Sequence, residues 1–261
     1  MTIFKHELRQ GRVALIIWTA AISFMLGICV LIYPEMSDQM GDVGGMFAEM
    51  GSFSAAFGMD RINFGEFVGF FGVECGNVLG LGGAFFAALL GISALAKEEK
   101  DHTAEFLLTH PVSRRLVIAE KLCAVIAQIV ILNVMVVGVT ALSVLAIGEE
   151  APVKTLALLF LAYFLMQLET AAVTFGISAF LSRGGVGIGI GLAAVFYFMN
   201  IISNLIQETE FLKYITPFGY AEGADIISDN AVNGRYLAVG MLFAAAGIFA
   251  AFRKFGGKDI M

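Results

Sequence analysis

Apolar residues gather into six long runs, and the shorter segments between them hold nearly all of the charged residues. A run of about 20 apolar residues, at about 1.5 Å per residue, is long enough to cross a hydrocarbon layer of about 30 Å. The runs therefore predict an all-α membrane protein in which residues 1–261 form one transmembrane domain. The six predicted spans are approximately Val13–Tyr33, Val68–Ala96, Leu122–Ile147, Leu156–Leu181, Val186–Ile206 and Tyr236–Phe252.

The overall composition argues against a soluble protein. Of the 261 residues, 59% are hydrophobic and 15% are charged, which leaves too few polar side chains to cover a soluble domain of this length. The first apolar run is too long for the core of a signal peptide and lacks a small-residue cleavage site, so we interpret it as a retained helix. No basic patch is interleaved with aromatic residues, which argues against nucleic acid as a partner.

The distribution of Lys and Arg predicts the orientation of the spans. Of the 16 Lys and Arg residues, twelve lie in the N-terminal segment, the second loop, the fourth connection and the C-terminal tail, and four lie on the opposite side. Loops rich in Lys and Arg stay in the cytoplasm. We therefore expect a multi-pass protein of the inner membrane with both termini in the cytoplasm. The segments on the other side, residues 34–67 and 207–235, are acidic and semi-apolar, and we expect short amphipathic pieces there at the outer surface.

Small residues predict where helices pack closely, because lipid tails do not drive apolar helices together. The second span carries five small residues at intervals of four, which predict one continuous ridge: Gly72, Gly76, Gly80, Ala84 and Ala88. The fifth span begins with two overlapping G-x-x-x-G pairs, formed by Gly185, Gly187, Gly189 and Gly191. These patterns predict helix contacts and leave open whether the contacts form within one chain or between two.

Glu169 lies near the centre of the fourth span. An ionised residue at that depth costs roughly 3 kcal/mol on insertion scales, so its side chain is expected to face protein or water. Two interpretations stand: a substrate or proton site, or a hydrogen bond between helices, made to Gln128 or Asn133 in the third span. Further polar residues of the spans, which either line a pathway or hold helices together, are Gln167, Asn200 and Asn204.

Motifs for catalysis are missing from the sequence. There is no G-x-x-x-x-G-K-[ST] loop to hold phosphates. No nucleophile, histidine and acid are grouped, and no cysteines or histidines have the spacing of metal ligands. We therefore expect that the chain is not an enzyme by itself and that it binds neither a metal nor a cofactor.

The segment between the second and third spans, residues 97–121, is the most informative part of the sequence. Asp101 is a good N-cap for a short helix over residues 102–109, and Pro111 ends it. Ser113 is then expected to cap the third span. Three apolar residues on the short helix suit either docking into a groove of a cytoplasmic partner or resting on the bilayer: Phe106, Leu107 and Leu108.

This segment resembles the loop after the second helix of ABC-2-type permeases, the membrane subunits of one class of bacterial ATP-driven exporters. The matching positions are Glu98, Glu99, Thr103, Glu105, Leu107, Leu108, Pro111, Ser113, Arg114 and Lys121. His102 departs from the pattern, since the family usually has Gly there. The start of the chain, FKHELRQGR, is similar to the amphipathic entry helix of the family, and Thr216-Pro217-Phe218 resembles the stretch before its last helix.

The resemblance implies two permease subunits, identical or paralogous, side by side in the lipid of the bacterial inner membrane. Each would dock a separate ABC ATPase subunit, which would bind ATP and Mg²⁺, and the pair would export or flip a substrate. The residues implied in docking are Glu98, Glu99, Thr103, Glu105, Phe106, Leu107, Leu108, Pro111, Ser113 and Arg114. Two alternatives are an ion-coupled secondary transporter that uses Glu169 and a membrane scaffold or immunity component without transport activity.

Overall fold

A computed structural model describes residues 2–40, 51–63, 65–100, 113–181 and 185–256 of the chain. In this part of the chain every regular element is helical, and six helical stretches are long and apolar enough to cross a membrane, as the sequence predicted. They are α1 (Thr2–Met40), the second span made of α4 (Phe67–Cys75), η1 (Gly76–Leu81) and α5 (Gly82–Lys100), α7 (Arg114–Ile147), α8 (Val153–Ser178), α9 (Val186–Leu205) and α11 (Gly234–Gly256).

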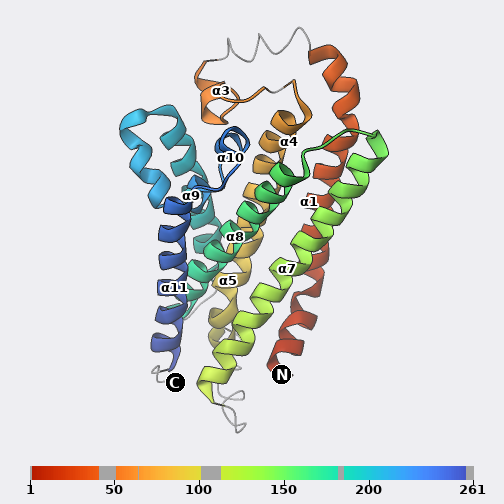
Figure 1. Ribbon diagram of the computed structural model, residues 1–261. Helices are drawn as coiled ribbons and strands as arrows, with labels where there is room; N and C mark the ends of the chain where they lie inside the picture. The colour runs from red at the N-terminus through yellow and green to blue at the C-terminus, as the bar shows by residue number, and fades with distance from the viewer. Residues whose placement is uncertain (1, 41–50, 64, 101–112, 182–184, 257–261) are drawn as a thin grey trace.

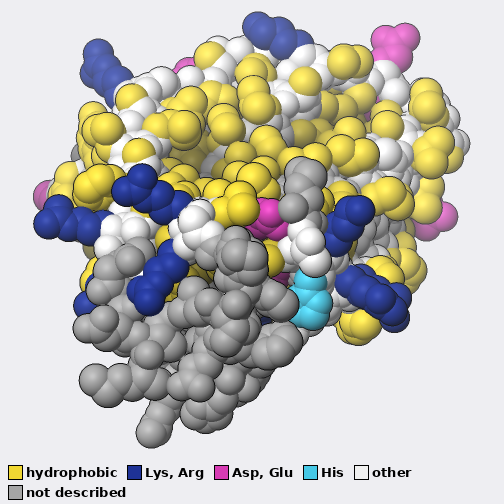
Figure 2. Space-filling model, turned by 90° about the horizontal axis from the view of Figure 1, so that it is seen from below, with side chains coloured by type: hydrophobic (Ala, Val, Ile, Leu, Met, Phe, Trp, Pro, Cys, Tyr) yellow, Lys and Arg dark blue, Asp and Glu magenta, His cyan; other side chains and the backbone are white. Residues whose placement is uncertain are grey.

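The spans form one bundle with both termini at the same end, which we call the terminal end (Figure 1). The short helices α3 (Ser52–Ala56) and α10 (Gly223–Asp229) lie at the opposite end, called the far end. Figure 2 looks onto the terminal end, where Lys and Arg side chains surround an apolar surface.

Several spans have different bounds from those predicted, and α7 begins at Arg114, eight residues before its predicted start. The helix α1 runs without a break from Thr2 through Pro34, so the entry segment is the first part of a long span and not a separate helix. The fourth span, α8, ends at Ser178, three residues before its predicted end, because residues 179 and 180 form a turn.

The second span is interrupted by the π-helix η1 between α4 and α5. The interruption falls within the predicted ridge of small residues, and its glycines make close contacts with more than one neighbour. A Cβ atom on Gly76 or Gly80 would lie 3.0 or 3.1 Å from Tyr163 of α8, whereas one on Gly72 would overlap Ile227.

The most extensive helix contact joins α5 and α8. A Cβ atom on Gly91 would overlap both Thr174 Oγ1 and the backbone oxygen of Ala171, so only a hydrogen atom fits there. The contact of α8 with α11 is equally close, with Gly176 against the backbone of Gly247. These two contacts place α8 at the centre of the bundle.

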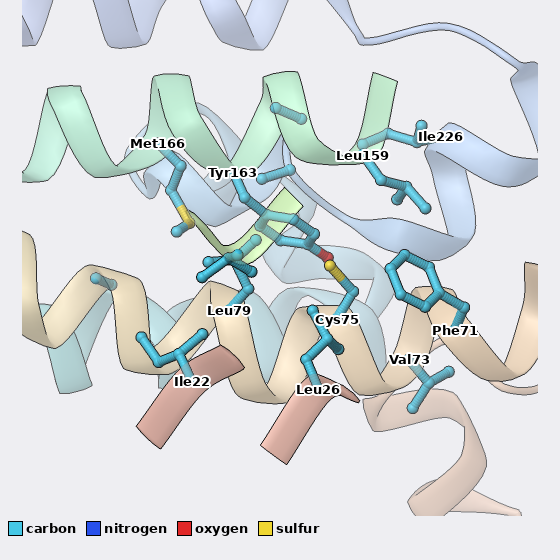
Figure 3. Packing of buried hydrophobic residues seen from close by; sticks show 14 of the residues in the cluster. Ile22, Leu26, Phe71, Val73, Cys75, Leu79, Leu159, Tyr163, Met166 and Ile226 are labelled. Atoms are coloured by element: carbon cyan, nitrogen blue, oxygen red, sulfur yellow. The ribbon is translucent and has the colours of Figure 1, made fainter. Parts of the chain in front are cut away.

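The main apolar core lies between the second span, α8 and α1. In Figure 3, Tyr163 of α8 points toward Cys75 and Leu79 of the second span, and Ile22 and Leu26 of α1 pack behind them. Tyr163 is 2% exposed, and Cys75 and Leu79 are fully buried. The aromatic ring thus fills the space that the glycines of η1 leave open.

Part of the segment after α9 differs from the amphipathic surface pieces that the sequence predicted, whereas η2 (Gln207–Tyr214) keeps exposed apolar and acidic side chains. The segment also contains η3 (Pro217–Gly219) and α10, and Phe218 and Ile226 are almost completely buried between the spans. Thr216 anchors it, because its hydroxyl donates to the backbone oxygen of Phe196 in α9 at 2.8 Å. Residues 216–226 are therefore part of the core of the bundle.

The glycines facing Tyr163 lead to a first prediction. Replacing Gly76 or Gly80 with Leu should overfill the contact and cost about 1–3 kcal/mol, which lowers the midpoint of thermal unfolding in detergent. Gly138→Leu is the control, because a Cβ atom on Gly138 of α7 meets no atom within 4 Å. Equal midpoints for all three variants would contradict the packing role of η1.

Candidate functional site

A small cavity of about 40 Å³ lies beside the π-helix η1, toward the far end of the bundle. Residues of the second span, α8, α9 and the segment after α9 line it. Single π-helical turns within α-helices often occur at functional sites, because they change the direction of the side chains they carry. The polar residues of the lining come from four different elements: Asn77, Tyr163, Tyr197, Asn200 and Glu222.

The carboxylate of Glu222 is the centre of the hydrogen bonds in this cavity. The side-chain amides of Asn200 and Asn204 donate to its Oε2 atom at 2.6 and 2.9 Å. The hydroxyl of Tyr197 donates to Asn77 Oδ1 at 3.1 Å. The two asparagines face one direction, as their spacing of one turn predicted, and they connect α9 to the segment after it.

Glu222 was not singled out from the sequence as a site residue. Its acidic character is visible there, but it is one acid among several in a semi-apolar segment. Its contacts with Asn200 and Asn204 span 22 and 18 residues and depend on the fold of the chain between them.

Glu169 accepts a hydrogen bond from the hydroxyl of Tyr220 at 2.7 Å. The expected contact with Gln128 or Asn133 is therefore wrong. Asn133 instead donates to Gln167 Oε1 at 2.6 Å. Two residues advance by about 200° around a helix, so Gln167 faces α7 while Glu169 faces the opposite side of α8. Gln128 donates to the backbone of its own helix.

Tyr220 lies between Glu169 and a polar cavity of about 270 Å³ at the far end. Burial of the phenol, followed by the neighbouring Glu169 carboxylate, raises the pKa of Tyr220. The phenol therefore remains protonated and donates to Glu169. In the same cavity Asp225 accepts from Lys213 Nζ at 3.1 Å and pairs with Arg61. These contacts tie the segment after α9 to the middle of α8.

At the terminal end, the buried carboxylate of Glu7 joins three spans. It accepts from Lys121 Nζ of α7 at 2.7 Å and from Lys97 Nζ of α5. Lys97 also donates to Gln10 of α1 at 2.7 Å. The sequence offered no local signal for this cluster, because Glu7 lies 90 and 114 residues from its two partners.

A cavity of about 290 Å³ lies beside this cluster, between α1, α5 and α7. Glu7, Gln10 and Lys97 line one part of it, and Trp18 and Phe86, whose ring centroids are 6.1 Å apart, line another. Within the described residues, no group of three or more His, Cys, Asp and Glu side chains is arranged to hold a metal ion.

Most of the predicted docking residues lie outside the described residues, which omit 101–112. At the edges of that gap, the backbone of Glu98 and Glu99 belongs to the last turn of α5. Ser113 is the N-cap of α7, as predicted, with its hydroxyl accepting from Leu116 N at 3.3 Å, and Arg114 is the first helical residue. The docking residues outside the description are Thr103, Glu105, Phe106, Leu107, Leu108 and Pro111.

A family model described as ABC-2 family transporter protein matches residues 1–222. The match covers the first five spans and the segment after α9 as far as Glu222. No curated protein matches the chain.

The contact of Tyr220 with Glu169 generates a second prediction. Tyr220→Phe removes the donor and leaves a buried carboxylate unpaired, which should cost about 1–3 kcal/mol. The midpoint of thermal unfolding in detergent should fall. Tyr214→Phe is the matched control, because Tyr214 is 41% exposed and its ring contact with Tyr236 does not need the hydroxyl. If both variants unfold at the wild-type temperature, this hydrogen bond does not stabilise the bundle.

Proposed function

The chain belongs to the ABC-2 family of transporter proteins, and we propose that it is the permease subunit of an ATP-driven exporter. Two such subunits form the pathway through the bacterial inner membrane and export or flip a substrate. ATP and Mg²⁺ bind to separate ABC ATPase subunits, which carry out hydrolysis. The family match over most of the chain is the observation that carries this proposal.

The Glu7 cluster supports coupling through residues 98–114. The two ends of this segment are held by Lys97 and Lys121, and both lysines contact the same carboxylate of α1. A force applied to the segment by an ATPase subunit would therefore act on α1, α5 and α7 together. Buried charged contacts of this kind are costly to break, because losing one partner leaves the other charge uncompensated.

Docking itself is assigned to the apolar residues of the segment. Leu107 and Leu108 insert into a groove of the ATPase subunit, with Phe106 beside them. Glu98, Glu99, Glu105 and Arg114 set the direction of approach. A helix in a groove binds through a few apolar anchors of this type.

The terminal end of the bundle is assigned to the cytoplasm. Twelve of the 16 Lys and Arg residues lie in the segments at that end, which the positive-inside rule assigns to the cytoplasmic side. The far end, with the Glu222 cavity, then faces the outside of the inner membrane.

The glycines of α9 support pairing with a second permease subunit. Gly185 and Gly189 face Ile92 of α5, whose side-chain atoms lie 3.0 and 2.8 Å from where their Cβ atoms would be. Gly187 and Gly191 are exposed, and their Cβ atoms would meet nothing within 4 Å. A face of two glycines one turn apart permits close approach of another helix, so we assign it to the subunit contact.

The docking assignment predicts loss of the ATPase subunit from a double variant, Leu107→Ala with Leu108→Ala. Truncating each anchor should remove roughly 1–3 kcal/mol of binding, enough to loosen the complex about tenfold or more. The subunit ratio and ATP turnover are measured on the purified complex. Lys5→Gln, at an exposed position of α1, should keep both. Full stoichiometry and coupled turnover in the double variant would exclude this segment as the docking element.

The orientation predicts which cysteines are labelled from outside intact cells. In a variant without native cysteines, single cysteines at Asp42 and at Asp229, the last residue of α10, should react with an impermeant maleimide. A cysteine at Lys258 should react only after the membrane is permeabilised. Labelling of Lys258→Cys in intact cells would reverse the assignment of the two ends.

A further inference from the structure

From the cavity beside η1 we infer a binding site for the ammonium group of an organic cation, with Glu222 as its counter-ion. The inference rests on the proposed export function and names a chemical class of substrate for it. The site lies at the far end, formed by the second span, α8, α9 and the segment after α9.

Glu222 is the one charged side chain among the described residues that line this cavity. Its hydrogen-bond partners are the neutral amides of Asn200 and Asn204, and no described Lys or Arg forms an ion pair with it. Two other acids of the bundle have cationic partners. Glu7 contacts Lys97 and Lys121, and Asp225 contacts Lys213 and Arg61. Arg61 Nη2 comes near Glu222, since both would contact a Cβ atom on Gly58, but Arg61 pairs with Asp225 and does not line the cavity. Inside the cavity, a carboxylate 9% exposed and bonded only to neutral amides favours a cationic ligand.

The cavity also supplies neutral acceptors for an ammonium group. Asn200 lines the cavity and is 7% exposed, and its Oδ1 atom has no hydrogen-bond partner among the described residues. Asn204 Oδ1 also lacks one, but Asn204 lies beside the cavity and not in its lining. Both amides direct their nitrogen atoms to Glu222, which leaves their oxygen atoms as acceptors. An ammonium group has only donors, up to three of them. The acceptors and the carboxylate match this requirement.

Aromatic rings form much of the remaining wall. Tyr163, Tyr197, Phe57 and Phe218 line the cavity. The faces of such rings attract cations, most strongly where water is excluded. The space around the Tyr163 hydroxyl depends on Gly76 of the π-helix. A Cβ atom on Gly76 would lie 3.0 Å from the hydroxyl oxygen.

The size of the cavity selects small groups. A cavity needs about 10–15 Å³ of this volume to hold one water molecule, so 40 Å³ has room for about three or four groups of that size. Methylammonium, with two heavy atoms, fits this space, and tetramethylammonium, with five, does not. The rest of a larger organic cation would lie outside the cavity.

The test uses the full chain, purified into lipid nanodiscs without the ATPase subunit. Its thermal unfolding is followed while methylammonium chloride is added at constant ionic strength, and the same series is run with sodium, potassium and tetramethylammonium chloride. Methylammonium should raise the unfolding midpoint in a saturable way, and the other three salts should not. An equal effect of all four salts, or none, overturns the assignment. A saturable effect of sodium or potassium would overturn it in favour of an inorganic cation.

Two variants test whether methylammonium binding depends on the carboxylate of Glu222. Glu222→Gln keeps the size and the amide contacts but removes the charge, and it should weaken methylammonium binding at least tenfold. Glu208→Gln removes the same charge from an exposed position of η2 and should bind like the wild type. Unchanged binding by Glu222→Gln contradicts the site. If that variant does not fold, the unfolding midpoints of the wild type in the four salts decide whether the site binds an ammonium group. Because no ATPase is present, a negative result here leaves docking through Leu107 and Leu108 unaffected.

Discussion

The close approach of α5 and α8 is the contact on which the other elements depend. Inside a membrane the hydrophobic effect does not hold helices together, and packing of small residues takes its place. Gly91 lets the two backbones come so near that a Cβ atom at this position would overlap Thr174 and Ala171. On the other side of α8, Gly176 brings in α11, and on the other side of α5, Gly189 brings in α9. The positions of α8, α9 and α11 thus depend on glycines, which have no side chain.

The π-helix η1 is the point where this packing changes direction. On the side of η1 toward the terminal end, α5 packs closely along α8. At η1 the glycines leave space that the ring of Tyr163 fills, and the cavity with Glu222 lies next to that ring. A buried carboxylate is tolerated there because two amides of α9 donate to it. The same elements that pack the far end of the bundle therefore also place its polar groups.

The second span connects the two polar regions of the bundle. Lys97 at its terminal end contacts Glu7, and Asn77 at its other end lines the Glu222 cavity. Among the described elements it is the one that reaches both. In the proposed exporter, a displacement of the docking segment would therefore act directly on the span that forms one wall of the cavity.

The sequence by itself determined the all-helical class, the number of spans and the family, because run length and a local motif carry that information. Ser113 as a cap and the common direction of Asn200 and Asn204 also follow from spacing along one helix. Only the tertiary structure decided that Glu169 pairs with Tyr220, that Glu7 joins Lys97 and Lys121, and that Glu222 receives Asn200 and Asn204. The physical reason is that lipid and protein are equally apolar. Hydrophobic periodicity therefore does not mark which face of a span meets another helix, and the partner of each buried polar group is set by the packing of glycines far away in the sequence.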